Sequence, residues 1–254
     1  MFSEIFSNIP LYLLSLPVAL LSLSIHETAH GYAAYKLGDP TAYNLGRLTL
    51  NPLKHIDPIG ALCMVIFRVG WAKPVPINVR NFKKPRVGMA ISAAAGPLSN
   101  LLLALLFALL LRLVILIFSM VNGELAQMIV YTGLVPTDTS FKLLCVLAYF
   151  LYMGIWLNIS LMIFNLIPIP PFDGSRIAHL LLPAKWYFKI MQYERYIMLG
   201  MLVLFWGLSL LNIPVLSAPT AWVVDRIFFL FGFRGEAGAL LNNMLYYVVE
   251  SLAF

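Results

Sequence analysis

Charged residues are scarce in this sequence. Only 11% of its 254 residues are Asp, Glu, Lys or Arg, whereas 61% are hydrophobic and the mean hydropathy is +0.87. A soluble chain of this length would form one or two domains with a charged surface, and the composition excludes that class. The sequence instead predicts a protein that crosses a membrane several times.

Cysteine is also rare, and acidic residues are outnumbered. The two cysteines, Cys63 and Cys145, lie in apolar runs, so neither a disulfide scaffold nor a thiolate metal site is indicated. The 17 basic residues exceed the 11 acidic ones and give a net charge of +6. In a membrane protein such an excess marks cytoplasmic loops, so we expect no nucleic-acid partner.

The most informative stretch is the motif HETAH at residues 26–30, which directly follows an uncharged run at residues 11–25. Histidines four apart on a helix face the same side, about one turn apart, so both imidazoles can bind one Zn²⁺. Glu27 then lies beside the metal as a potential general base. A chance occurrence would leave three ionisable side chains unpaired in an apolar helix, at a large cost in free energy. The pattern therefore predicts a metal site.

Four long apolar segments predict membrane-spanning helices. The polar region at residues 36–87 includes an apolar piece, 59–69, that would cover only ~17 Å as a helix, too little for a ~30 Å hydrocarbon core. We expect this piece to be re-entrant or interfacial. The tail, 218–254, is either an interfacial helix or a further short crossing. The four predicted spans are residues 10–35, 88–120, 141–167 and 196–215.

The predicted fold class is an all-α helical bundle of about four to six spans, with a small β-like loop after the first span. Residues 75–82 supply the β-like element, because every second residue from Val75 to Val79 is aliphatic. Pro74 and Pro76 cannot donate backbone hydrogen bonds, so only an edge strand fits. Such an edge either pairs with an extended substrate segment or merely caps the membrane face.

Lysine and arginine are distributed unevenly. Thirteen of the 17 lie in residues 36–86 and 174–195, which are therefore predicted to be cytoplasmic. Residues 121–140 contain no Lys or Arg and are predicted to form an external loop. This orientation brings the HETAH motif and the proline-rich end of the third span to the same, cytoplasmic, depth. We assign residues 1–217 to one membrane core and residues 218–254 to a C-terminal segment.

A catalytic zinc site needs a third protein ligand and keeps one position for water. Asp173 is the best candidate, because it follows a proline-rich break at the right depth, where irregular backbone is tolerated if it lines a cavity. Asp173 has an alternative role as the N-cap of a short helix. His55 could approach the zinc pocket from the loop side, but it is at least as well explained as a surface loop residue. His179 is better explained as a packed or interfacial side chain than as a ligand.

HETAH in one span and NLIPIPPFDG at residues 165–174 after a later span together resemble the site-2 proteases, the intramembrane zinc metalloproteases. The segment GPLSN at residues 96–100 resembles the GPxxN segment of that family. The resemblance covers about residues 20–180. Phe172 departs from the family, because Leu is common at this position. No polar stretch except 36–87 is long enough for the PDZ or CBS domain of many members, so we expect a short form without either.

The resemblance implies a ligand set and a mechanism. His26, His30 and Asp173 would bind one zinc ion per chain. Glu27 would take the proton of the attacking water, and Asn165 would donate a hydrogen bond to the developing oxyanion. The partners would be a transmembrane segment of a membrane-protein substrate and the lipid bilayer. We expect a multi-pass protein of the cytoplasmic membrane of a prokaryote, with its site toward the cytoplasm.

Three other functions fit parts of the pattern. His and Asp side chains inside a helical bundle can conduct a metal ion or a proton, as in a transporter or sensor. A metal-dependent hydrolase of lipids and an inactive homologue that only binds helices are further alternatives. Hydrolysis requires Glu27 whereas a simple conduit does not, and the intact HETAH motif argues against the inactive homologue.

Overall fold

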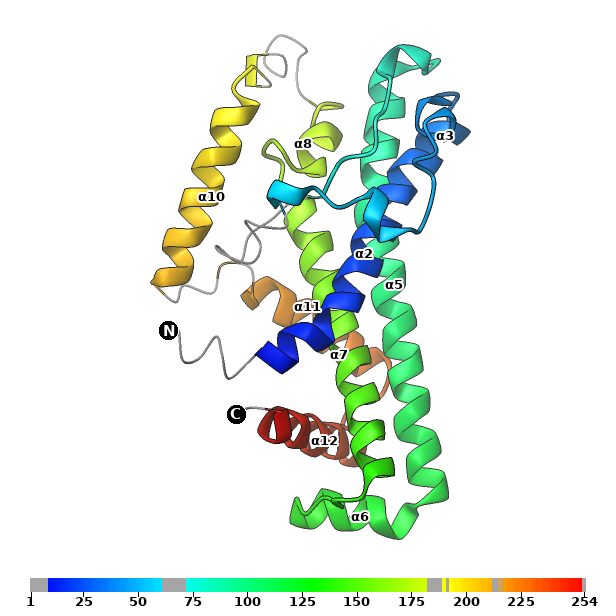
Figure 1. Ribbon diagram of the computed structural model, residues 1–254, viewed down its shortest axis with the longest axis vertical. Helices are drawn as coiled ribbons and strands as arrows, with labels where there is room; N and C mark the ends of the chain where they lie inside the picture. Colours follow the sequence, from blue (N-terminus) through cyan, green and yellow to red (C-terminus); the bar gives the residue numbers. More distant parts are fainter. Residues whose placement is uncertain are drawn as a thin grey trace. The chain divides into compact units, whose positions relative to one another are not determined.

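The computed structural model describes residues 9–60, 72–181, 189–190, 192–211, 215 and 217–252, and over these residues the protein is all-α (Figure 1). An isolated antiparallel bridge between Ile56 and Ala72 is the one β-type pairing in this part of the chain. The helices, in chain order, are α2 (Ile9–Lys36), α3 (Thr41–Asn44), the 3-10 helices η1 (Pro52–Lys54) and η2 (Val79–Asn81), α5 (Pro85–Val121), α6 (Gly123–Thr132), α7 (Thr139–Asn165), α8 (Asp173–Ala178), α10 (Glu194–Leu210), α11 (Ser217–Leu230) and α12 (Glu236–Leu252).

The four predicted spans correspond to α2, α5, α7 and α10, each of which begins within three residues of its predicted start. In the part of the chain that the structure describes, α5 and α7 are long and apolar enough to cross a membrane. The 37 residues of α5 extend over about 55 Å, well beyond the ~30 Å of a hydrocarbon core. An all-α protein with long apolar helices is therefore confirmed.

The prediction of a β-like loop is wrong for the described residues. Residues 73–78 have no regular secondary structure, and they lead into η2 rather than into a strand. The aliphatic residues do alternate, but Pro74 and Pro76 lack two of the backbone N–H groups that a β-ladder needs as hydrogen-bond donors. The predicted re-entrant piece, 59–69, lies mostly outside the described residues.

The connection at residues 121–140, predicted to be a loop, contains the ten-residue helix α6. Ala126 and Ile129, three residues apart, are buried on one face of α6. The helix ends at Gly133, whose φ of 69° lies in the left-handed region that glycine adopts without strain. The tail forms α11 and α12.

The chain divides into two compact units. The first comprises Met1–Ala19, Leu102–Ile159 and Ala221–Phe254. In this unit α6 packs on α12, and the Asn243 side chain donates a hydrogen bond to the Ile129 carbonyl at 2.8 Å. Gly154 allows close packing of α7 on α5, because a Cβ there would lie 2.6 Å from the Phe107 ring.

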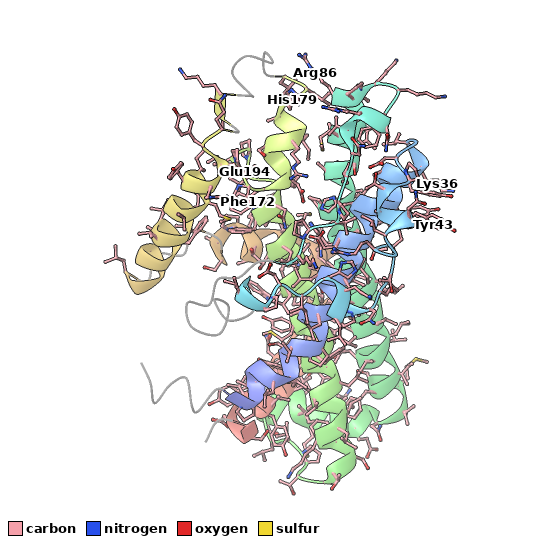
Figure 2. The ribbon with its side chains drawn as sticks, turned by 45° about the horizontal axis from the view of Figure 1, so that its top comes forward. Lys36, Tyr43, Arg86, Phe172, His179 and Glu194 are labelled. Carbon is pink, nitrogen blue, oxygen red and sulfur yellow. The ribbon has the colours of Figure 1, made fainter. Side chains whose placement is uncertain are left out.

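The second unit comprises Leu20–Leu101 and Ser160–Thr220 and contains all predicted site residues. After α2 the chain folds back through α3, and Tyr43 stacks on Tyr35 with ring centroids 5.1 Å apart. Figure 2 shows Tyr43 close to Lys36 at the end of α2. The first turns of α5 pack on α2, where the Ser92 hydroxyl donates to the His30 carbonyl at 2.8 Å.

Candidate metal centre

Three side chains from two parts of the second unit meet at one point. The Nε2 atoms of His26 and His30 lie 3.0 Å apart, as expected for residues one turn apart on α2. The Asp173 carboxylate oxygen Oδ2 lies 3.2 Å from Nε2 of His26 and 3.1 Å from Nε2 of His30. The side chains of His26 and His30 are only 6% and 9% exposed. These three atoms form a nearly equilateral triangle, shielded from solvent.

The triangle fits a zinc ion. Ligand atoms 2.0–2.1 Å from a tetrahedral zinc are about 3.3 Å from one another, slightly more than the distances observed here. Two neutral imidazoles and one carboxylate are a donor set of catalytic zinc sites, and three protein ligands leave a fourth position for water. His26, His30 and Asp173 could together hold a metal ion. His26, His30 and Asp173 therefore suit a zinc ion, the metal that the sequence predicted.

Each imidazole is oriented by a hydrogen bond on its far side. The Nδ1 of His30 donates to the Ser92 carbonyl at 2.8 Å, and the Nδ1 of His26 pairs with the Asn100 side-chain oxygen at 2.5 Å. A proton on Nδ1 leaves the lone pair on Nε2, which faces the Asp173 carboxylate. Both partners come from α5, so this helix fixes the tautomer and the direction of the two histidines on α2.

Gly96 supplies the space in which the two imidazoles lie. A Cβ at this position would be 2.5 Å from Nε2 of His30 and 2.6 Å from Cε1 of His26. Any larger residue would therefore overlap the proposed ligands. The GPLSN segment thus contributes two features to the site, the bare backbone of Gly96 and the amide of Asn100.

Asp173 reaches the histidines because a compact turn follows α7. Gly174 permits this turn, since a Cβ there would lie 2.5 Å from the Ile167 carbonyl oxygen. Phe172, which departs from the family pattern, packs edge-on against Phe164 with ring centroids 4.3 Å apart. The alternative role of Asp173 as an N-cap is wrong, because the N-cap of α8 is Phe172 and Asp173 is its first residue.

The predicted catalytic residues lie on the same unit but make contacts of their own. Glu27 accepts a hydrogen bond through Oε2 from the backbone N–H of Val75 at 2.8 Å. Asn165 is the last residue of α7, and its side-chain amide donates to the Leu161 carbonyl at 3.0 Å. Residues 73–78 therefore run beside the predicted base, although they form no strand there.

The two other histidines lie outside the cluster. His55 is 2% exposed, and its Nε2 pairs with the Thr49 carbonyl at 2.8 Å. His179 follows α8, and Figure 2 shows it beside Arg86. Burial, with the positive charge of Arg86, lowers the pKa of the His179 imidazole. His55 lies in the loop that follows α2, as expected, but the prediction that it is a surface residue is wrong, because the residue is buried. His179 is a packed side chain.

Sequence reasoning missed two contributors to the site. Ser92 acts through its backbone carbonyl, for which a sequence carries no signal. Gly96 belongs to a run of small residues that predicts a buried helix interface, but its place against the two imidazoles follows only from the close approach of α5 to α2. The small residues around them are consistent with such an approach, because small side chains let helices pack closely.

These features define a class of protein. A helix with HExxH that presents both imidazoles to a third, carboxylate ligand, with the motif's glutamate next to them, is the arrangement of an HExxH metallopeptidase. Residues 15–208 match the model of Peptidase family M50. The chain belongs to this family.

Relatives of known description match most of the chain. "Putative zinc metalloprotease YwhC" of Bacillus subtilis (strain 168) is 42% identical over 186 residues, which cover 73% of this chain and 77% of that protein. A protein of the same description named Rip2, from Mycolicibacterium smegmatis, is 26% identical over 250 residues, 93% of this chain and 80% of its own length. The Rip2 protein of Mycobacterium tuberculosis (strain H37Rv) is 24% identical over 227 residues, 87% and 74% of the two chains. No solved structure matches the chain significantly.

Proposed function

We propose that this protein is a zinc-dependent endopeptidase that hydrolyses peptide bonds within or near the transmembrane segments of other membrane proteins. The observation that carries the proposal is the triangle of His26, His30 and Asp173, whose Nε2 and Oδ2 atoms lie within 3.2 Å of one another. The HETAH motif and the membership in Peptidase family M50 support the reaction class, and the apolar helices α5 and α7 support the membrane setting.

One zinc ion per chain would be held by His26, His30 and Asp173. When bound, zinc lowers the pKa of a water molecule and polarises the substrate carbonyl. Glu27 takes the proton from the attacking water and then passes it to the leaving amine. Asn165 donates a hydrogen bond from its amide to the oxyanion that develops on the carbonyl. One of the two N–H bonds of Asn165 is directed to Leu161, which leaves the second for the substrate.

The proposed location is the cytoplasmic membrane of a prokaryote, with the site toward the cytoplasm. The polar segments on either side of the site carry most of the lysine and arginine, which favours this orientation. A helical substrate has its carbonyls in hydrogen bonds, so the cleaved stretch must unwind first. Water reaches the site from the side of these polar segments.

The test is the Glu27→Gln variant. Gln has the size of Glu but cannot take a proton, so cleavage should fall by roughly 10²–10⁴-fold, the usual contribution of acid–base catalysis. Zinc content, measured by elemental analysis of the purified protein, should stay near one per chain. Membranes from cells with either form are compared for proteins that remain uncut only in the variant.

A second variant, His26→Ala, serves as a control that removes a ligand and should lose both zinc and cleavage. Undiminished proteolysis by Glu27→Gln would falsify the assignment of the base. A metal conduit would instead keep its transport in Glu27→Gln, which separates the two functions.

A further inference from the structure

Two carboxylates, one on α2 and one just beyond its end, hold the same extended segment. Glu27 accepts a hydrogen bond from the Val75 N–H at 2.8 Å, and Asp39 accepts one from the Asn78 N–H at 2.7 Å through its Oδ2. Between these two carboxylates Gly31 leaves room for the segment to pack on α2, because a Cβ at Gly31 would lie 2.9 Å from Cγ1 of Val75. Residues 73–78 are thus held at two points, at Val75 by the glutamate of the catalytic motif and at Asn78 by Asp39.

Asp39 is a buried residue at the centre of a partly buried hydrogen-bond network. Its side chain is 0% exposed, and its second oxygen, Oδ1, accepts from the Thr41 hydroxyl at 2.5 Å, the Thr41 N–H at 3.1 Å and the Asn81 side-chain amide at 2.7 Å. Burial acts to raise the pKa of Asp39, but the hydrogen bonds from Thr41, Asn81 and Asn78 outweigh it and leave this pKa below its usual value. Asp39 is therefore a charged anchor that ties α3 and η2 to the end of α2.

Other contacts fix the beginning of the segment. The Lys73 N–H donates to the His55 carbonyl at 2.8 Å, and the Arg47 guanidinium donates to the carbonyls of Lys73 and Pro74 at 2.9 and 3.3 Å. These contacts precede Val75. The described hydrogen bonds to other elements that follow it lead to Asp39, and beyond them Phe82 packs against Gly88 in α5. Without Asp39 the segment would lose the hydrogen bonds that hold its second half.

The orientation of Glu27 depends on how firmly this segment is held. A glutamate side chain loses conformational entropy when it is fixed in one rotamer, so the contact that fixes it must offset that loss. The flanking residues Pro74 and Pro76 have no N–H, so Val75 is the one donor that residues 74–76 offer to Glu27. A single hydrogen bond orients a carboxylate only if its donor is itself in a fixed position.

We propose that Asp39 is a positioning residue for the hydrolytic reaction. Asp39 holds residues 73–78 in place, so that the Val75 N–H keeps the Glu27 carboxylate directed for catalysis. This inference rests on the proposed function. Asp39 acts through the segment and touches neither the metal ligands nor the substrate. Glu27 Oε2 is engaged by Val75, and Oε1 is left to take the proton from water.

The decisive variant is Asp39→Asn. In this variant an NH₂ group replaces one of the two carboxylate oxygens. The NH₂ group cannot accept hydrogen bonds from the surrounding donors, so the bonds to that oxygen are lost while the size of the side chain is kept. The kcat for a substrate identified with the Glu27→Gln membranes should fall by about 10- to 100-fold, the usual loss when a supporting residue is removed. KM and zinc content should stay unchanged, since no ligand is touched. Hydrogen exchange of a peptide covering residues 73–82 should become faster in the purified protein.

A matched control exists in the same region of the chain. Asp57 caps the backbone N–H groups of Ile59 and Gly60, both at 2.9 Å, and its described hydrogen bonds go to these two groups and not to residues 73–78. Asp57→Asn removes the same kind of contact, and it should leave kcat and the exchange of residues 73–82 at wild-type values.

A rescue variant tests the route. In Asp39→Asn/Asn81→Asp the donor and acceptor of the 39–81 contact are exchanged, while one oxygen at position 39 remains for the Asn78 N–H. The double variant should recover part of the lost kcat, and no recovery would contradict the route. If Asp39→Asn does not fold, Asn81→Ala removes one of the four hydrogen bonds at an exposed position and should give a smaller loss of kcat with faster exchange.

Three results would overturn the inference. These are a kcat for Asp39→Asn within twofold of the Asp57→Asn control, a loss of kcat matched by an equal loss of zinc, or a rise in kcat. A rise would mean that Val75 restrains the base instead of directing it. The proposed function fails separately, when the wild-type protein and Glu27→Gln cleave equally.

Discussion

Gly96 is a position where one methyl group should decide whether metal binds. A Cβ there would lie 2.5 Å from Nε2 of His30, closer than real carbon contacts. Gly96→Ala should therefore displace an imidazole and reduce the zinc content of the purified protein at least tenfold, with about 1–3 kcal/mol of overpacking. Elemental analysis and thermal unfolding measure the two effects.

The control for Gly96 is Gly200 in α10, where a Cβ would meet no atom of the described residues within 4 Å. Gly200→Ala should keep its zinc and gain about 0.5–1 kcal/mol of stability, the usual difference between the two residues in a helix. Full zinc content in both variants would show that α5 does not confine the imidazoles.

Asn100 should determine how tightly the metal is held. Its side-chain oxygen pairs with Nδ1 of His26 at 2.5 Å and so keeps Nε2 free for the metal. Asn100→Ala should weaken zinc affinity by roughly 10–100-fold, whereas Asn100→Asp keeps an acceptor and should retain most of it. Competition with a chelator of known affinity gives the measurement. Asn51→Ala removes the asparagine N-cap of η1 and should leave the zinc affinity unchanged. An equal loss of zinc affinity in this variant would point to a general effect on the fold.

At the residue scale, the sequence predicted the side chains whose chemistry depends on local spacing. His26 and His30 are four apart, so their common face follows from helix geometry alone. Asp173 was found from its depth and its proline-rich surroundings, and the cluster with both histidines is present. Ser92 and Gly96 could not be found in this way, because their roles arise only when α5 approaches α2.

At the scale of elements, long apolar segments predicted helices well and a short alternating segment predicted a strand wrongly. A run of 27 or 37 residues leaves little choice, since backbone groups in lipid must be satisfied within the helix. Residues 73–78 are too few for the alternation of aliphatic residues to show whether they form a strand. The N–H groups of Val75 and Asn78 pair with the carboxylates of Glu27 and Asp39 instead of a neighbouring strand. Side chains distant in sequence took the place of a ladder.

The anchoring of this segment should depend on pH in one direction. The pKa of Asp39 in the folded protein is lowered, so its contribution to stability is complete above its unfolded pKa of about 3.9 and is lost as the pH falls through the folded value. The difference in unfolding temperature between wild type and Asp39→Asn should be constant from pH 7 to about pH 4 and shrink below that. Thermal unfolding in detergent measures it. A difference that shrinks already between pH 7 and pH 5 would contradict an ionised Asp39.

At the scale of the whole molecule, the proposed orientation makes a prediction that needs no substrate. Lys84 and Glu124 are both exposed, and they flank the two ends of α5, whose length of about 55 Å exceeds the hydrocarbon core. If residues 36–86 are cytoplasmic, Glu124→Cys should react in intact cells with a maleimide that cannot cross the membrane. Lys84→Cys should react only after the cells are opened, because the charge of its surroundings keeps that end inside. Both are made in a background without Cys63 and Cys145. The reverse labelling pattern would place the metal site toward the outside, and labelling of both in intact cells would mean that α5 does not cross.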